Sequence, residues 1–198
     1  MKLILASQSP RRRQLLSMTG ISFETAPSNC DEGSIARLLK NDRPDISERV
    51  LAERLALAKA RAVLPSYPED LILAADTLVT LDGVLFGKPK DRAEARKMLR
   101  TLAGRTHLVG TGVALISSST EEVFSTRSEV TFRPLSPVVE ALIDRYVETD
   151  LPLDKAGAYG IQELGGLLIE RIEGDFFSVM GLPIGQVYER LQAYDIWP

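Results

Sequence analysis

The chain of 198 residues is long enough for one domain, or for one large lobe with a smaller one, and its formal net charge is −3. Hydrophobic residues make up 44% and charged residues 26%, and the acidic balance argues against a nucleic-acid-binding protein. One cysteine, Cys30, excludes an internal disulfide, and the sole histidine, His107, cannot build a multi-histidine metal site and is interpreted as structural. No apolar stretch approaches the roughly 20 residues that span a bilayer, and the N-terminus does not resemble a signal peptide. We therefore expect a cytoplasmic protein without a membrane partner.

The first predicted elements are a buried strand over residues 3–6 and a helix over residues 11–19. Between them, Ser9 is a favourable N-cap, and Pro10 suits the first helical position, where a backbone N–H is not needed. Three arginines, residues 11–13, fall in the first helical turn, where the helix dipole disfavours cations. Phosphate is the usual anion at a strand-to-helix turn, and a solvated basic turn is the alternative. The candidate substrate-binding residues of this segment are Ser7, Ser9, Arg11 and Arg12.

Four more segments have the apolar spacing and capping residues of helices. In one of them, Asp91 and Glu94 form a capping pair at the start, and Gly104 follows the end. The four segments are residues 47–64, 91–103, 136–146 and 183–193.

Apolar or alternating runs between the helices predict the strands of a sheet. Asp82-Gly83 and Gly174-Asp175 are hairpin-turn sequences, and each lies between two of these runs. The chain has no internal repeat, no Walker motif and no dinucleotide-binding glycine motif. We therefore expect an α/β protein with a large mixed sheet flanked by helices. The runs are residues 71–75, 78–80, 84–86, 107–117, 122–132, 167–172 and 176–180.

Two acidic segments are candidates for catalysis and metal binding. Asp76 follows the apolar run 71–75, and open α/β sheets place ligands at the carboxyl ends of strands. A partly desolvated carboxylate there acts as a general base or binds Mg²⁺, and a turn-capping residue is the alternative. Asp31-Glu32 lies in the predicted loop after residues 21–25, where Glu32 offers a second carboxylate to the same metal. Paired surface acids are common, so an ordinary acidic loop is the alternative there.

Three lysines are candidates for binding an anionic substrate. Lys59 lies on a largely apolar helix and either extends to solvent or points into a site. Lys88 stands between a glycine and a proline, and a plain loop lysine is the alternative reading. Residues 154–162 are rich in glycine, which lets a backbone approach a ligand, and Lys155 and Gln162 add a cation and an amide. A glycine-rich turn packed on the core is the alternative for this segment.

Taken together, these segments resemble the Maf family of nucleoside triphosphate pyrophosphatases. Each segment is a weak signal alone, but they occur in the family's order from residue 3 to residue 183, so the resemblance covers nearly the whole chain. The matching segments are Ser7-Gln8-Ser9-Pro10-Arg11-Arg12, Asp31-Glu32, Lys59-Ala60, Ala75-Asp76-Thr77, Gly87-Lys88-Pro89, residues 154–162 and Gly181-Leu182-Pro183.

The resemblance implies a single domain over residues 1–198, with an elongated α/β fold shared with inosine-triphosphate pyrophosphatases and one cleft between two lobes. It also implies hydrolysis of a nucleoside triphosphate substrate to the monophosphate and pyrophosphate, with Mg²⁺ or Mn²⁺ as the divalent metal, and often a homodimer. Asp76 matches the family's proton acceptor. We expect Asp76 and Glu32 to share the metal, while Lys59, Lys88 and Arg12 bind the phosphates with help from backbone N–H groups near Ser7 to Ser9.

Three positions separate the branches of this family. The branch that acts on dTTP and UTP has the arginine, threonine and glutamine found here as Arg11, Thr77 and Gln162. The branch that resembles 7-methyl-GTP hydrolases has other residues there, so the sequence predicts a dTTP/UTP pyrophosphatase. A 7-methyl-GTP pyrophosphatase and a non-catalytic nucleotide-binding regulator of cell division remain as alternatives. Whether the activity serves nucleotide-pool cleaning or division arrest is left open.

Overall fold

The computed structural model describes residues 1–43 and 45–198. Over these residues the α-helices are α1 (Pro10–Ser17), α2 (Glu32–Asp42), α3 (Glu48–Val63), α4 (Arg92–Leu102), α5 (Pro137–Val147), α6 (Phe176–Met180) and α7 (Ile184–Gln192). The strands are β1 (Leu3–Leu5), β2 (Phe23–Thr25), β3 (Leu71–Leu81), β4 (Val84–Phe86), β5 (Thr106–Ile116), β6 (Glu121–Phe132) and β7 (Ile169–Glu173). None of the helices formed by these residues is long and apolar enough to cross a membrane.

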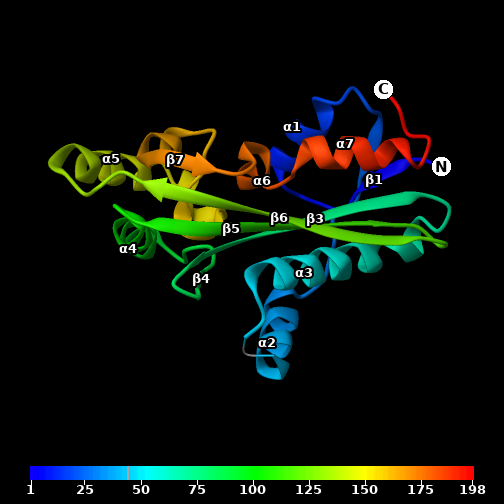
Figure 1. Ribbon diagram of the computed structural model, residues 1–198, viewed down its shortest axis with the longest axis horizontal. Coiled ribbons are helices and arrows are strands. Elements are labelled where there is room, and N and C mark those ends of the chain that lie inside the picture. The colour runs from blue at the N-terminus through cyan, green and yellow to red at the C-terminus, as the bar shows by residue number, and fades with distance from the viewer. Residues whose placement is uncertain (44) are drawn as a thin grey trace. The chain divides into compact units, whose positions relative to one another are not determined.

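The described strands form one seven-stranded sheet with the order β2-β1-β3-β5-β6-β7, and β4 pairs with β3 beside that path (Figure 1). Strand β1 runs parallel to both β2 and β3, and Leu3 lies opposite Phe23 and Leu71. The β3–β4 and β6–β7 pairs are antiparallel. The predicted α/β class with a mixed, partly antiparallel sheet is therefore confirmed.

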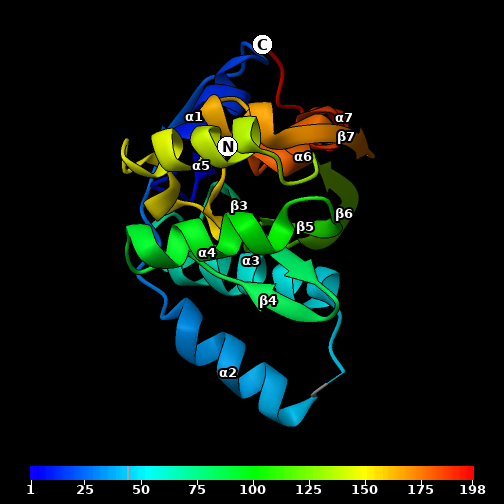
Figure 2. The ribbon, with the colours of Figure 1, turned by 90° about the vertical axis from the view of Figure 1, so that its left-hand side faces the viewer.

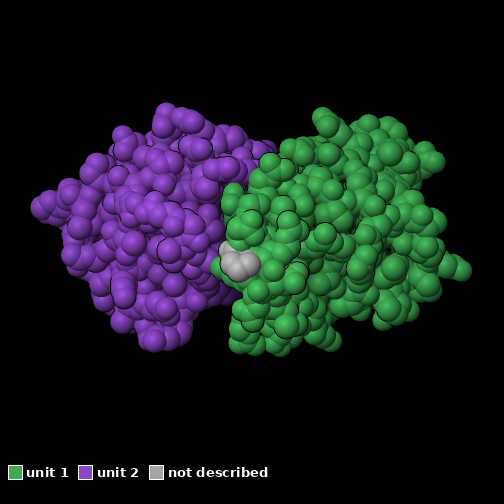
Figure 3. Space-filling view, turned by 60° about the horizontal axis from the view of Figure 1, so that its bottom comes forward, with its two compact units in different colours: residues 1–77, 111–126, 181–198 green, residues 78–110, 127–180 purple. Residues whose placement is uncertain are grey.

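The chain divides into two compact units, coloured separately in Figure 3. Unit 1 comprises residues 1–77, 111–126 and 181–198, and unit 2 comprises residues 78–110 and 127–180. Each unit has its own cluster of buried hydrophobic side chains.

In unit 1, helix α3 covers one face of the sheet, and helices α1 and α7 lie on the opposite face (Figures 1 and 2). Small residues let α3 approach the sheet closely. A Cβ at Gly112 would lie 2.3 Å from the backbone of Ala52 and Glu53, so only glycine permits this contact between β5 and α3. The close packing holds the side chains of α3 against strand β3. The buried members of this core are Ile4, Ala6, Ala26, Ala56, Leu57, Ala60, Val63, Ile72, Ala74, Ala114 and Ile116.

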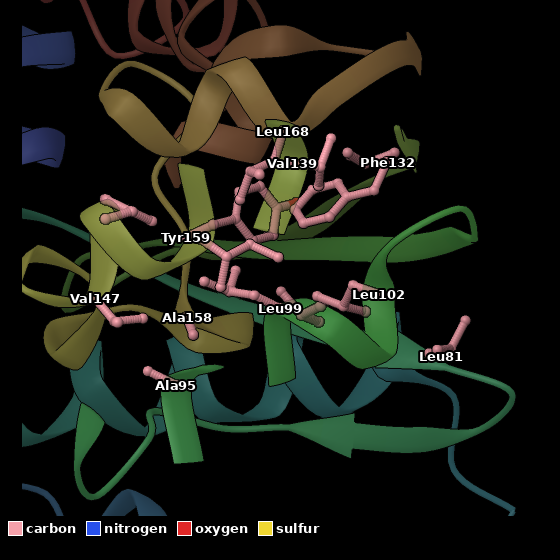
Figure 4. Packing of buried hydrophobic residues seen from close by; sticks show 14 of the residues in the cluster. Leu81, Ala95, Leu99, Leu102, Phe132, Val139, Val147, Ala158, Tyr159 and Leu168 are labelled. Carbon is pink, nitrogen blue, oxygen red and sulfur yellow. The ribbon is translucent and has the colours of Figure 1, made fainter. Parts of the chain in front are cut away.

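In unit 2, helices α4 and α5 contribute to a core that also contains a buried aromatic group (Figure 4). The rings of Phe132 and Tyr159 pack edge-on with centroids 4.9 Å apart. His107 is fully buried, and its Nε2 lies 2.8 Å from the Tyr159 hydroxyl. Burial lowers the pKa of His107 to about 4, so the ring is neutral and structural, as the sequence predicts.

Several local predictions are confirmed. Ser47, Asp91 and Ser136 cap helices α3, α4 and α5 through their side chains. The Asp82-Gly83 hairpin joins β3 to β4, with Leu81 opposite Val84. Ser9 occupies the N-cap position of α1, but its side chain makes no capping hydrogen bond.

Three local predictions are wrong. Glu32 does not lie in a loop, because the Asp31 side chain accepts from the Ser34 N–H at 3.0 Å and caps helix α2, which begins at Glu32. The runs 71–75 and 78–80 are one continuous strand, β3, so Asp76 lies within a strand and not at its end.

The predicted hairpin at Gly174-Asp175 is also wrong, because residues 176–180 form helix α6. The Asp175 carboxylate accepts hydrogen bonds from the N–H groups of Phe177 (2.9 Å) and Ser178 (3.2 Å), which favours a helical start. Strand β7 pairs instead with β6, where Ile172 lies opposite Val130.

We expect the substitution His107→Phe to remove part of the protein's acid sensitivity. The buried native ring binds a proton less readily than the histidine of the unfolded chain, whose ordinary pKa is near 6.5. Above about pH 6.5, protonation of His107 therefore does not affect the free energy of unfolding. As the pH falls toward 4, protonation of this histidine in the unfolded chain lowers the free energy of unfolding by about 3 kcal/mol. Urea unfolding at several pH values should show a steeper loss in the wild type than in His107→Phe. Equal losses would contradict the prediction.

Candidate functional site

A buried ion pair lies at the centre of the candidate site in unit 1. Helix α3 supplies Lys59 and strand β3 supplies Asp76, and each side chain is only 8% exposed. The Lys59 ammonium donates to Oδ1 of Asp76 at 2.5 Å. Two buried charges require each other, because either one left alone would be destabilised by several kcal/mol.

Glu32 adds a second carboxylate to this pair. It is the first residue of α2, and its Oε1 lies 3.1 Å from the Lys59 ammonium. Its side chain is half exposed, unlike that of Asp76. The structure thus brings together the three residues that the sequence names separately, with the lysine bridging the two acids.

The pKa of Asp76 is raised above its ordinary value. Burial is the main cause, and a smaller part comes from the nearby charge of Glu32. Lys59 and Arg12 oppose the shift through their positive charges. Asp76 is therefore a carboxylate that binds a proton more readily than an exposed aspartate, which suits a general base.

The carboxylates of Asp76 and Glu32 fit a metal site that is completed by oxygen atoms of the substrate. Lys59 contacts one oxygen of each acid, Oδ1 of Asp76 and Oε1 of Glu32, so the contact leaves Oδ2 and Oε2 as hard oxygen donors. No group of three or more His, Cys, Asp or Glu side chains within residues 1–43 and 45–198 could hold a metal by itself. Mg²⁺ is commonly held by one or two carboxylates with phosphate oxygens and water, and this donor set fits that pattern.

Arg12 and Thr77 form a second cluster in unit 1. The Arg12 guanidinium donates from Nε to the carbonyl of Gly181 at 2.8 Å and from Nη2 to the Thr77 hydroxyl at 3.2 Å. The Thr77 hydroxyl is also 3.0 Å from that of Thr111 on β5. Burial lowers the pKa of Arg12, and the charges of Asp76 and Glu32 oppose that shift.

In the turn before α1, some polar groups already form hydrogen bonds within the chain. The Ser7 N–H donates to the Leu5 carbonyl at 2.9 Å, and the Ser9 N–H donates to the Ser7 hydroxyl at 3.1 Å. Ser7 is buried and Ser9 is half-buried, while Arg11 is partly exposed. Of the expected backbone donors near Ser7 to Ser9, two are therefore already hydrogen-bonded within the chain.

Unit 2 contains the remaining predicted residues, which differ in their surroundings. Lys88 is exposed. Lys155 is buried, and its ammonium donates to the Leu151 carbonyl at 2.5 Å and to Asp154 at 2.6 Å. Gln162 is half-buried, and its Oε1 is buried without a hydrogen-bond partner among the residues described. Lys155 therefore bonds chiefly to its own loop.

Three polar residues that contact the predicted segments are not predicted from the sequence. They are Thr111 next to Thr77, Glu163 next to Gln162, and Tyr146, whose hydroxyl accepts the Gly160 N–H at 3.0 Å. No local motif marks Thr111 or Tyr146, because each meets its partner only through folding. Glu163 lies beside the glycine-rich segment and carries a charge, which is the only signal that could have identified it.

Comparison with known proteins decides the family. The sequence profile of the family described as Maf-like protein matches residues 2–194. The chain belongs to the Maf family. It is 48% identical over 200 residues to a protein of Moorella thermoacetica named dTTP/UTP pyrophosphatase, and the match covers 99% of this chain and 97% of the relative.

Two further relatives of this Maf protein carry the same name. The protein of Bacillus velezensis is 45% identical, with 98% of this chain and 97% of the relative covered. The protein of Thermotoga maritima is 42% identical, with 100% of this chain and 91% of the relative covered. The resemblance stated from the motifs is confirmed at the level of the family.

We expect Lys59→Met to lower the free energy of unfolding by about 3 kcal/mol or more near pH 7, because Asp76 loses its buried partner. Without Lys59 the raised pKa of Asp76 rises further, so native Asp76 stays protonated to a higher pH while Asp76 of the unfolded chain ionises. The loss of stability should therefore grow as the pH rises. The double variant Lys59→Met/Asp76→Asn should recover much of the loss, because no unpaired charge remains. Urea unfolding measures all three proteins.

A matched control is Arg61→Met on the same helix, which breaks the exposed pair with Glu121 and should cost under about 1 kcal/mol. If Lys59→Met costs no more than Arg61→Met, the buried pair does not have the assigned importance.

Proposed function

We propose that this protein hydrolyses dTTP and UTP to the nucleoside monophosphate and pyrophosphate in the presence of Mg²⁺ or Mn²⁺. The observation that carries the proposal is the buried Asp76, with a raised pKa and held by Lys59 beside Glu32. The names of the full-length relatives support the same reaction and the same substrates.

Asp76 is the proposed proton acceptor. Its Oδ1 is held by Lys59 at 2.5 Å, which fixes the orientation of the carboxylate that is proposed to accept a proton from the attacking water. The raised pKa favours this proton transfer, because the ideal pKa of a general base lies closer to the working pH than that of an exposed aspartate. Lys59 keeps Asp76 ionised in its buried position.

Asp76 and Glu32 are the residues that would hold the divalent metal, together with phosphate oxygens of the substrate. When bound, such a metal neutralises negative charge on the phosphate groups. Lys59 remains between the two acids and limits the charge that they place next to the anionic substrate.

Arg12 is the proposed phosphate ligand in unit 1. Its Nε and one Nη2 donor are used by Gly181 and Thr77, which fixes the plane of the guanidinium and leaves its other donors for phosphate. The hydroxyls of Ser7 and Ser9 are proposed to assist. Lys88, an exposed lysine of unit 2, is proposed to contribute a further positive charge.

Gln162, Arg11 and Thr77 are the proposed determinants of base recognition. An amide matches the N3–H and a neighbouring carbonyl of uracil or thymine, because it has both a donor and an acceptor. The buried, unpartnered Oε1 of Gln162 supports this role, since a ligand donor would satisfy it. Arg11 is proposed to donate to another base carbonyl.

The first test is analysis of the products that the purified protein forms from dTTP, UTP, CTP, GTP and 7-methyl-GTP with Mg²⁺ or Mn²⁺. We expect pyrophosphate and monophosphate from dTTP and UTP. Turnover of 7-methyl-GTP alone would keep the reaction and overturn the substrate assignment. Binding without pyrophosphate release from any nucleotide would support a regulatory protein instead.

The second test is Asp76→Asn, which removes the proposed base and leaves the side chain's shape nearly unchanged. We expect kcat for UTP to fall by about 100-fold or more. Asp70→Asn is the matched control, because Asp70 is also in unit 1 but binds the backbone N–H of Lys2 outside the site. Near-normal turnover by a folded Asp76→Asn protein would exclude Asp76 as the base.

A further inference from the structure

The loop that carries Gln162 is held by a buried lysine. Lys155 is only 4% exposed and lies 3.0 Å from Oε2 of Glu163 as an ion pair. The same ammonium bonds to Leu151 and Asp154, so the lysine keeps two other partners besides Glu163. The ion pair with this buried ammonium favours one position of the Glu163 carboxylate.

The backbone of this loop has little room to move. The Gly160 N–H donates to the buried Tyr146 hydroxyl at 3.0 Å. A Cβ at Gly160 would lie 2.7 Å from Cε of Lys155, so a larger residue there would displace the lysine side chain. The Gly166 N–H donates to the Glu163 carbonyl at 2.9 Å, which closes the turn after Gln162.

Glu163 determines which end of the Gln162 amide is held. Nε2 of Gln162 donates to Oε1 of Glu163 at 3.4 Å, a long hydrogen bond to a charged acceptor. A carboxylate has only acceptors, so the opposite orientation would place two oxygens against each other. The amide oxygen of Gln162 is therefore left free, and it lacks a hydrogen-bond partner among the described residues, as does Oε2 of Glu163, whose contact with Lys155 is an ion pair.

We infer that Glu163 is a specificity-determining residue, which makes Gln162 a hydrogen-bond acceptor toward N3 of the base and thereby selects uracil and thymine against cytosine. N3 of uracil and thymine carries a hydrogen, whereas N3 of cytosine presents a lone pair. Cytosine would leave the Gln162 oxygen unpaired and facing another acceptor. The inference rests on the proposed function, in which Gln162 reads the base.

The test is the discrimination between uridine and cytidine nucleotides in Glu163→Gln. A glutamine at this position both donates and accepts, so the Gln162 amide can turn and offer its NH₂ group to cytosine. We expect the ratio of kcat/KM for UTP over CTP to fall by about 10-fold or more, with part of the change arising from a gain on CTP. Glu163→Ala, which removes the acceptor, should change the ratio in the same direction.

Asp154→Asn is the matched control. It removes the other acidic partner of Lys155 but leaves the Glu163–Gln162 contact in place, so the UTP/CTP ratio should stay near that of the wild type. An unchanged ratio in folded Glu163→Gln and Glu163→Ala would overturn the inference. An equal fall in Asp154→Asn would also overturn it, because the effect would then come from the loop as a whole.

Binding separates this inference from the proposed reaction. Affinities for α,β-methylene UTP and α,β-methylene CTP, measured by calorimetry, report base preference without turnover. If the wild type releases no pyrophosphate, the proposed reaction fails. The inference is still supported if the wild type prefers the uridine analogue and Glu163→Gln loses that preference, and it is overturned if both proteins bind the two analogues with the same ratio.

Discussion

The buried pair of Lys59 and Asp76 is the constraint on which the organisation of unit 1 depends. Neither charge is stable in the interior alone, so α3 and β3 must keep the two groups within hydrogen-bonding distance. The contact in turn requires α3 to lie close to the sheet. Gly112 and the small side chains of Ala52 and Ala56 meet that requirement, because a larger residue would push the helix and its lysine outward.

Arg12 is a second residue that stabilises unit 1 through polar contacts. It binds the Gly181 carbonyl and the Thr77 hydroxyl, and so joins parts of unit 1 that lie far apart along the chain. A residue that anchors the chain in this way has less freedom when a substrate arrives. In its proposed role as a phosphate ligand, Arg12 would have its remaining donors oriented before binding, which would reduce the entropy lost on binding.

Unit 2 follows the same physical rule with different residues. The polar atoms of Lys155 and Tyr146 are buried, and they are satisfied largely by the glycine-rich loop and the segment before it. The core of unit 2 also contains His107 in contact with Tyr159. Because the His107 ring is neutral, it needs no oppositely charged partner. Movement of the loop would break hydrogen bonds of its buried groups, which favours a single arrangement of the segment that carries Gln162.

The sequence by itself determined the features that depend on neighbouring residues. Ser47, Asp91 and Ser136 begin helices because each side chain reaches an N–H group three residues later, and Asp82-Gly83 turns because the bend involves only its own backbone. The ordered motifs likewise identified the family without any structure.

Only the tertiary structure decided which of the marked residues meet. It continued β3 through Asp76, placed Glu32 next to Lys59, and added Thr111 to the groups around Thr77. A buried polar side chain must find a partner, but its type and spacing do not say which one. The packing of helices and strands determines the partner, because it brings together residues that lie tens of positions apart in the sequence.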